Sequence, residues 1–312
     1  MCRSRLVAIC RYVIFSAAVL GQAATSPSEE PPSTPPGFTP AGNEFSFDTG
    51  QLRGTLRGQG RTLGVTKLVD ASSNTDVAGA YGLLSPYRLL TSAARFGHAA
   101  WDWSSTARRL PDGAVEVRWQ ADAEHPLELA AVYRWSKPDS LDVELRVTPR
   151  QDLPKFELFL ASYFRGFDQA AAYVQPCAET NQKSAFLAAT KESGVWQMFP
   201  RDEEAVRLIG DGRWKRPPNP VDWVIRPRLA APLAIRRDAA TGLTALVMAK
   251  PGDGFAVSMP FGEEGHRSLY LSLFGRDLVH DQPATARARL IVGQAITDQR
   301  AVEVYQRFAA EP

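Results

Sequence analysis

The stretch VEVRWQADAEHPLELAAVYRWSKPDSLDVELRV, residues 115–147, decides the fold. It contains three runs, 115–119, 127–135 and 141–147, in which apolar side chains take every second position. A period of two is typical of antiparallel strands with one face in the core and one in water. The turn-forming sequence KPDS separates the second run from the third, and PDG precedes the first. We therefore predict a three-stranded meander, with Trp119 and Trp135 on its core face.

The same pattern continues through most of the chain. Further strands are expected at 156–164, 233–237, 243–248, 255–259, 269–274 and 288–292. No segment between them has the amphipathic helical period that a parallel βαβ unit requires. A sheet this wide must split or curl to cover its apolar face. The expected fold class is therefore all-β, a large two-layer antiparallel β-sandwich.

Two helices are expected beside these strands. Thr297 or Asp298 can cap a helix in which Ala301, Tyr305 and Phe308 share one face. This short C-terminal helix is predicted to pack on the rim of a sheet. A second, weaker helical pattern covers residues 202–209.

The first 43 residues have the features of a targeting signal followed by a linker. Three arginines precede the apolar run 12–20, and Gly21-Gln22-Ala23 supplies small residues, so residues 1–23 are expected to be a cleaved secretory signal. An uncleaved membrane anchor is the alternative, although a nine-residue run is too short to span the bilayer. Residues 24–43 contain six prolines and are expected to be a disordered linker. A single domain, 44–312, would follow, in the periplasm or outside the cell, with Cys177 as its only cysteine and no stable membrane insertion.

The charge balance excludes a general electrostatic attraction to nucleic acid. The chain has 312 residues, 36 basic and 34 acidic, and a formal charge of +2. Without the three arginines of residues 1–23, 33 basic residues remain against 34 acidic ones, a formal charge of −1. This balance favours a neutral or weakly charged ligand, such as a sugar.

Three segments resemble the galactose-mutarotase-like (aldose epimerase-like) family. They are Gly82–Thr91 running to AWDW at 100–103, then Leu110–Trp119, and Ala288–Gln294 running to Tyr305. The resemblance implies an antiparallel super-sandwich that binds sugars. None of the four histidines lies in that family's catalytic motif, so the resemblance implies a fold and a ligand class but no reaction.

General acid–base chemistry on a sugar needs groups that titrate near neutral pH, which directs attention to histidines with carboxylate neighbours. His266 follows Glu263 in a glycine-containing turn before a strand, and His98 lies four residues before Asp102. These four residues are the candidate catalytic groups. The alternative is a solvated turn around His266 and a structural role for His98. His125 and His280 are expected to lie at the surface.

Sugar recognition needs flat apolar faces and polar groups for hydroxyls. Trp101 and Trp103 flank Asp102, which on a strand would place both indoles on one side. The long proline-containing connection 194–228 carries further candidates, which with Arg88 complete the expected ligand-binding set: Trp196, Arg213, Trp214 and Trp223. The alternative is that these indoles fasten the connection to the sheet, and that Arg88 forms a surface ion pair.

Other motifs do not support a cofactor or a metal. The chain has no His-Glu-x-x-His, no Cys-x-x-Cys and no phosphate-binding Gly-x-x-x-x-Gly-Lys.

Two functions stay open. One is an exported carbohydrate-binding protein, and the other is a sugar-active enzyme, epimerase-, lyase- or hydrolase-like, with histidine and carboxylate groups in one cleft.

Overall fold

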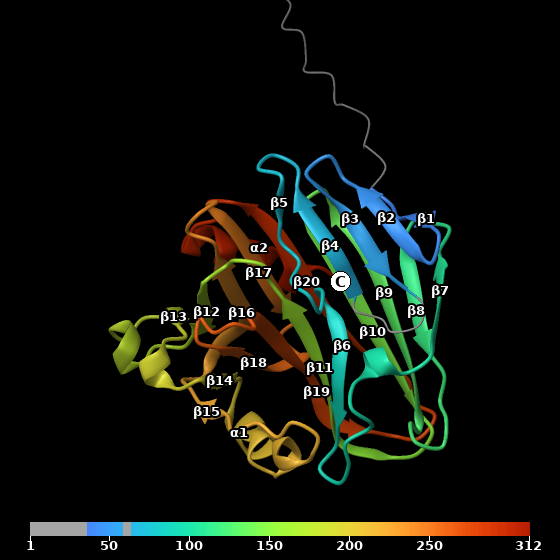
Figure 1. The fold of residues 1–312 in the computed structure, drawn as a ribbon. Coiled ribbons are helices and arrows are strands. Elements are labelled where there is room, and N and C mark those ends of the chain that lie inside the picture. The colour runs from blue at the N-terminus through green and yellow to red at the C-terminus, as the bar shows by residue number, and fades with distance from the viewer. Residues whose placement is uncertain (1–35, 59–63) are drawn as a thin grey trace, which may run out of the picture. The chain divides into compact units, whose positions relative to one another are not determined.

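The computed structural model describes residues 36–58 and 64–312, and within them the strands form three sheets (Figure 1). The expected signal segment, and the linker as far as residue 35, lie outside the described residues. Almost all strand pairs are antiparallel; the pairing of β14 (Trp196–Pro200) with β15 (Val224–Ile225) is parallel.

The nine-stranded sheet contains the predicted meander. β8 (Val115–Trp119), β9 (Leu127–Lys137) and β10 (Ser140–Pro149) are consecutive neighbours, as expected. Tyr133 of β9 lies opposite both Val115 and Val143, and all three side chains are fully buried. The sheet order is β13-β12-β16-β17-β20-β10-β9-β8-β7, completed by β13 (Ala185–Ala188), β12 (Gln169–Val174), β16 (Leu229–Arg237), β17 (Leu243–Ala249), β20 (Ala284–Gln294) and β7 (Ser105–Arg109).

Two smaller sheets complete the sandwich. The six-stranded sheet has the order β15-β14-β18-β19-β11-β6, with β18 (Gly254–Pro260), β19 (Ser268–Leu278), β11 (Leu153–Tyr163) and β6 (Ser85–Leu90). The five-stranded sheet runs in chain order through β1 (Thr39–Ala41), β2 (Glu44–Asp48), β3 (Leu52–Arg57), β4 (Gly64–Asp70) and β5 (Thr75–Asp76).

One hydrophobic core joins all three sheets. The indole of Trp135 in the nine-stranded sheet packs on Phe47 of the five-stranded sheet, with ring centroids 4.8 Å apart. Leu158 and Leu271 of the six-stranded sheet belong to the same buried cluster. The predicted core residues Trp119 and Trp135 are each 1% exposed. The two-layer all-β sandwich is therefore confirmed.

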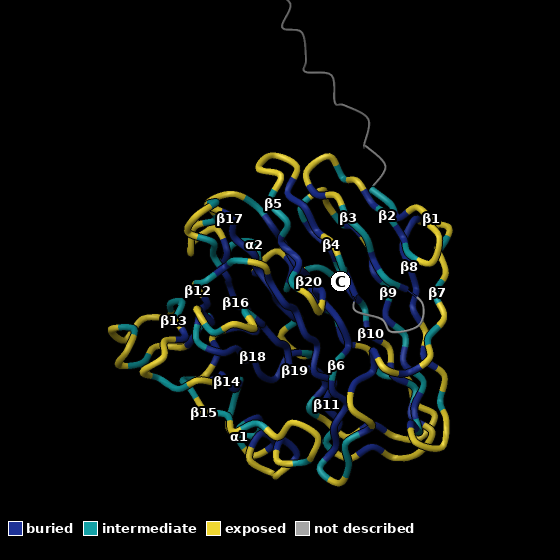
Figure 2. Tube along the Cα trace, viewed as in Figure 1, coloured by how far each residue is buried: buried dark blue, intermediate teal, exposed yellow. Residues whose placement is uncertain are grey.

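The six-stranded sheet is buried on its second face as well (Figure 2). A separate apolar cluster covers that outer face, and it includes Phe159, Met198 and Tyr270 from the strands with Leu208 and Trp214 from the connection above them. The connection 194–228 contains more regular structure than the weak helix predicted at 202–209. It contains β14, the helix α1 (Glu203–Ile209), the 3-10 turn η4 (Arg213–Lys215) and β15. β14, α1 and η4 bury apolar side chains on the sheet, whereas Val224 and Ile225 of β15 are each 42% exposed.

Both predicted helices are present. The Asp202 carboxylate caps α1 by accepting from Ala205 N at 2.9 Å, and Thr297 Oγ1 caps α2 (Asp298–Ala310) by accepting from Arg300 N at 3.2 Å. The expected rim position of α2 is wrong. Ala301, Tyr305 and Phe308 pack on the outer face of β16, β17 and β20, where Leu233, Leu246 and Ile291 would otherwise meet water. No helix among the described residues is long and apolar enough to span a bilayer.

Regular structure is present before the predicted domain boundary at Glu44. Phe38 is 1% exposed, its N–H donates to Gly113 O at 2.9 Å, and Thr39–Ala41 pair with β2. The expected linker 24–43 is therefore wrong for its last part, because one aromatic side chain among the prolines finds a place in the core beside Trp135.

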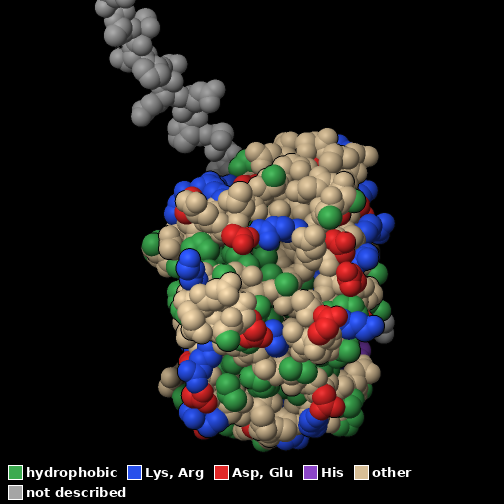
Figure 3. Space-filling model, turned by 90° about the vertical axis from the view of Figure 1, so that its left-hand side faces the viewer, with side chains coloured by type: hydrophobic (Ala, Val, Ile, Leu, Met, Phe, Trp, Pro, Cys, Tyr) green, Lys and Arg blue, Asp and Glu red, His purple; other side chains and the backbone are tan. Residues whose placement is uncertain are grey.

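Charges of both signs are interspersed on the face that carries β12, β13 and α2, with hydrophobic side chains between them (Figure 3). This pattern agrees with the nearly equal numbers of basic and acidic residues. That face therefore offers no extended single-sign surface for a polyanion.

Candidate functional site

A cleft of about 440 Å³ opens on the outer face of the six-stranded sheet. Its described lining brings together predicted site residues that are far apart in the sequence, namely Arg88, His98, Trp101, Trp196, Trp214, Trp223 and His266. Aromatic side chains that the sequence analysis did not select complete its walls: Tyr81, Tyr87, Phe159, Tyr163 and Tyr270. We call this site the aromatic cleft. Its volume and apolar lining are typical of small-molecule sites.

The aromatic rings form a continuous wall. Trp101 stacks on Tyr87 with centroids 4.2 Å apart and planes 8° apart, and Tyr81 lies nearly parallel to the same indole, with centroids 6.3 Å apart. From Tyr87 the contacts continue through Phe159 and Trp223 to Trp196, with successive centroid distances of 6.4, 6.1 and 6.0 Å. Such a surface offers flat apolar faces along its whole length.

A bulge explains why β6 supplies two neighbouring side chains to this wall. Arg88 pairs with Phe159, whereas Pro86 pairs with Leu160, so the register shifts by one residue between them. Tyr87 is the extra residue. Strict alternation would send Tyr87 and Arg88 to opposite faces of the sheet, but the bulge lets both line the cleft.

His98 lies at one end of the wall and is held by a carboxylate. Its Nδ1 is 2.8 Å from Asp102 Oδ2, and its Nε2 is 3.4 Å from Asn219 Nδ2. The ring meets Tyr87 edge-on, with centroids 6.4 Å apart. The predicted relation between His98 and Asp102 is therefore present, because the 3-10 turn η1 (Ala100–Asp102) brings the carboxylate back over the preceding segment.

His266 lies at the opposite end, beside Trp196, with ring centroids 5.5 Å apart. Its carboxylate partner is Glu264, whose Oε1 is 2.9 Å from His266 Nδ1, and not the predicted Glu263. The tight turn between β18 and β19 places residue 264 beside residue 266, and Glu264 also accepts from the His266 N–H at 2.8 Å. Each end of the cleft thus carries a histidine held by a carboxylate.

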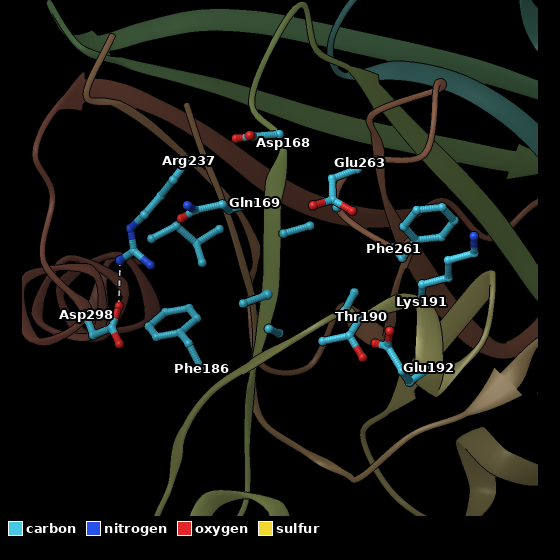
Figure 4. A pocket seen from close by; sticks show the side chains of 16 residues that line it. Asp168, Gln169, Phe186, Thr190, Lys191, Glu192, Arg237, Phe261, Glu263 and Asp298 are labelled. Carbon is cyan, nitrogen blue, oxygen red and sulfur yellow. Dashed lines mark hydrogen bonds and ion pairs between the residues drawn. The ribbon is translucent and has the colours of Figure 1, made fainter. Parts of the chain in front are cut away.

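Glu263 lines a second cavity of about 480 Å³ on the other side of the same turn (Figure 4). Asp168 lines the same cavity, and Arg237 pairs with Asp298 at 2.5 Å further along the wall. The candidate catalytic set is therefore divided, because Glu263 does not share a cavity with His98 or His266.

Trp103 also lies away from the aromatic cleft. Its ring packs on His125 with centroids 3.7 Å apart, and both residues are buried. Because η1 is a 3-10 turn and not a strand, residues 101 and 103 point in different directions. The expected surface position of His125 is also wrong. Its ring covers the Trp103 indole, and its Nδ1 lies 2.9 Å from the Asp122 carboxylate.

Arg213 is buried behind the cleft wall, next to Trp214. Its side chain is fully buried and pairs with Glu157 at 3.1 Å and with Asp211 at 2.7 Å. Burial raises the pKa of Glu157. Burial alone would lower the pKa of Arg213, but the two carboxylates outweigh it and hold that pKa above its usual value. Arg213 therefore fixes the wall and does not line the cleft.

Within residues 36–58 and 64–312, no three His, Cys, Asp or Glu side chains lie close enough together to form a metal site. In the aromatic cleft, the two histidine–carboxylate pairs are instead separated by the ring wall. The described arrangement offers stacking surfaces, one buried arginine and two histidines for a bound molecule.

No protein-family model and no curated protein sequence matches the chain. Several solved structures match the chain. A galactose mutarotase-like protein from Lactobacillus casei ATCC 334 matches with a TM-score of 0.51 and 10% identity, over 80% of this chain and 100% of that one. The α-N-acetylgalactosaminidase NagBb from Bifidobacterium bifidum, in complex with GalNAc, matches with a TM-score of 0.52 and 12% identity, over 84% of this chain but 38% of that one. Carbohydrate-active proteins are thus among the structural neighbours, and the chain has the galactose-mutarotase-like fold.

Proposed function

We propose that this chain is an exported carbohydrate-binding protein and that the aromatic cleft is its sugar site. The observation that carries the proposal is the continuous wall of rings, because sugars present C–H faces that stack on flat aromatic surfaces while their hydroxyls need polar partners. Arg88, His98, Asn219 and His266 supply polar groups in the same cleft.

Two further observations support the proposal. The structural neighbours include an α-N-acetylgalactosaminidase in complex with GalNAc, of which the match covers 38%, so a sugar is the ligand of at least one protein that contains this fold. The pattern of residues 1–23 supports export to the periplasm or the exterior, where saccharides from outside the cell are available.

Replacing Trp101 with alanine is expected to weaken sugar binding about tenfold or more. The substitution removes the ring that stacks on Tyr87 in the wall, and a loss of about 1.4 kcal/mol of stacking corresponds to tenfold in affinity. Isothermal titration calorimetry of the mature chain against a panel of oligosaccharides measures the effect.

Tyr173→Ala is the matched control, because Tyr173 packs on Phe186 outside the aromatic cleft, with ring centroids 5.3 Å apart. It is expected to leave sugar affinity unchanged. A wild-type chain that gives no binding heat with any saccharide, or a Trp101→Ala chain that binds as tightly as wild type, contradicts the proposal.

A sugar-active enzyme, epimerase-, lyase- or hydrolase-like, is the second candidate function. The observation that favours it is the pair of histidines at opposite ends of one cleft, each held by a carboxylate. A histidine oriented in this way can exchange a proton with a bound substrate, and two of them can act on its two sides.

On this second function, His98→Ala and His266→Ala are each expected to reduce turnover by about 10²- to 10⁴-fold. Both histidines are about half exposed, so the substitutions remove proton transfer without opening the core. Polarimetry and reducing-end assays on the sugars that bind measure turnover, with calorimetry to confirm that each variant still binds. Binding without any measurable turnover contradicts the enzyme and leaves the binding protein.

A further inference from the structure

Residues that line the aromatic cleft carry three buried polar atoms without a hydrogen-bond partner among the described residues. They are Arg88 Nε, Trp214 Nε1 and Trp223 Nε1. All three are donors that cannot accept. A buried unpaired donor costs free energy, so a ligand rich in acceptors would complete this site better than one that mainly donates.

Arg88 is the central feature of this set. It is 6% exposed, and its cationic carbon lies 5.1 Å from the centre of the Tyr87 ring and 5.4 Å from that of Trp214. Its Nη2 makes one long contact, 3.4 Å to Tyr87 Oη. The contrast with Arg213 is direct, since that equally buried guanidinium has two carboxylate partners. Arg88 has none among the described residues.

The charges around Arg88 favour the binding of an anion. No aspartate or glutamate is among the described residues that line the cleft. A second cation, Arg95, lies nearby and donates to the backbone oxygens of Gly97, His98 and Arg216. Burial and then the positive charge of Arg88 lower the pKa of Arg95 to about 10. Arg88 and Arg95 thus act on each other as like charges at this end of the cleft, where the Asp102 carboxylate pairs with His98.

We propose that the aromatic cleft binds a carboxylate-bearing saccharide, one that contains a uronic acid, with the carboxylate on Arg88 and the sugar rings on the aromatic wall. This inference rests on the proposed function and names its ligand class. The planar guanidinium presents paired donors that match a carboxylate, and such charge-assisted bonds are roughly twice as strong as neutral ones. The overall charge balance favours a neutral or weakly charged ligand, and the local charge of the cleft favours an anionic one, because the cleft lining differs in charge from the chain as a whole.

The test compares uronic-acid oligosaccharides with their methyl esters, which keep the shape and lose the charge. Galacturonate, glucuronate and mannuronate oligomers are titrated calorimetrically into the mature wild-type chain, Arg88→Met and Arg88→Lys. Arg276→Met is the matched control, because it removes one exposed cation of β19 outside the cleft. Circular dichroism and thermal melting confirm that each variant folds.

We expect the wild type to bind at least one acidic oligomer at least tenfold more tightly than its ester. Arg88→Met is expected to lower affinity for the acid about tenfold to a hundredfold, as for the loss of a charge-assisted pair, and to leave the ester within about threefold. Arg88→Lys retains part of the preference, and Arg276→Met retains all of it.

Equal affinity for acid and ester, or an equal loss for both in Arg88→Met, overturns the acidic ligand and leaves the sugar site standing. Preferential binding of neutral oligosaccharides also overturns the acidic ligand and leaves the sugar site standing. Absence of binding to every charged and neutral saccharide contradicts the proposed function itself. If Arg88→Met does not fold, the affinity for the acid relative to the ester, measured in the wild type and in Arg88→Lys, still tests whether the cleft prefers an acidic ligand.

Discussion

Replacing Arg213 with methionine is expected to lower the free energy of unfolding by about 3–5 kcal/mol. The substitution leaves the fully buried Glu157 carboxylate without the guanidinium that pairs with it at 3.1 Å, and Asp211 loses the same partner. An uncompensated charge inside a protein is more costly than a missing pair. Equilibrium unfolding in urea, followed by circular dichroism, measures the change.

Two comparisons test the cause of that loss. Combining Arg213→Met with Glu157→Leu is expected to recover much of the stability, because the buried carboxylate is gone as well. Arg207→Met is the matched control, since Arg207 pairs with Glu204 on the exposed side of α1, and little change is expected. A single variant as stable as wild type shows that Glu157 does not depend on Arg213.

Replacing Trp135 with alanine is expected to destabilise the protein by about 3–5 kcal/mol. Trp135 is 1% exposed and joins the nine-stranded sheet to Phe38 and Phe47 at the N-terminal side, with ring centroids 6.3 and 4.8 Å apart. Its removal leaves a cavity between two layers that cannot easily collapse, because both walls are sheets. Urea unfolding provides the measurement.

Trp135→Phe is the comparison for this site, because it keeps an aromatic ring and is expected to lose clearly less stability than alanine. Tyr173→Ala, at the half-buried ring pair outside the main core, is expected to cost less than Trp135→Ala. A loss for Trp135→Ala no larger than that for Tyr173→Ala would mean that the contact between these sheets is not an important source of stability.

Local patterns predicted most of the fold because they depend on residues close in the sequence. Alternation in 115–147 gave β8, β9 and β10, and a capping threonine followed by three apolar positions gave α2. The rim position of α2 and the domain boundary at Glu44 were wrong. Both depend on distant contacts, of Phe308 with the outer face of the nine-stranded sheet and of Phe38 with Trp135.

The site was predictable where a residue type carried its own chemical signal. Tryptophans and histidines in loops pointed to the cleft, and the spacing of His98 and Asp102 gave a real contact. Tyr87 was missed because it lines the cleft through a bulge in β6, which alternation cannot reveal. Trp103 and Arg213 were selected by type but lie elsewhere, since a 3-10 turn directs one and a buried carboxylate pair holds the other.

The second buried face of the six-stranded sheet has a consequence for redesign. Phe159, Tyr270 and Trp214 seal that face and also line the aromatic cleft. A substitution chosen to reshape the ligand preference at these positions therefore also changes how well the sheet is sealed. The same side chains therefore determine both ligand specificity and protein stability. A change in specificity at these positions will usually require a compensating substitution that restores stability.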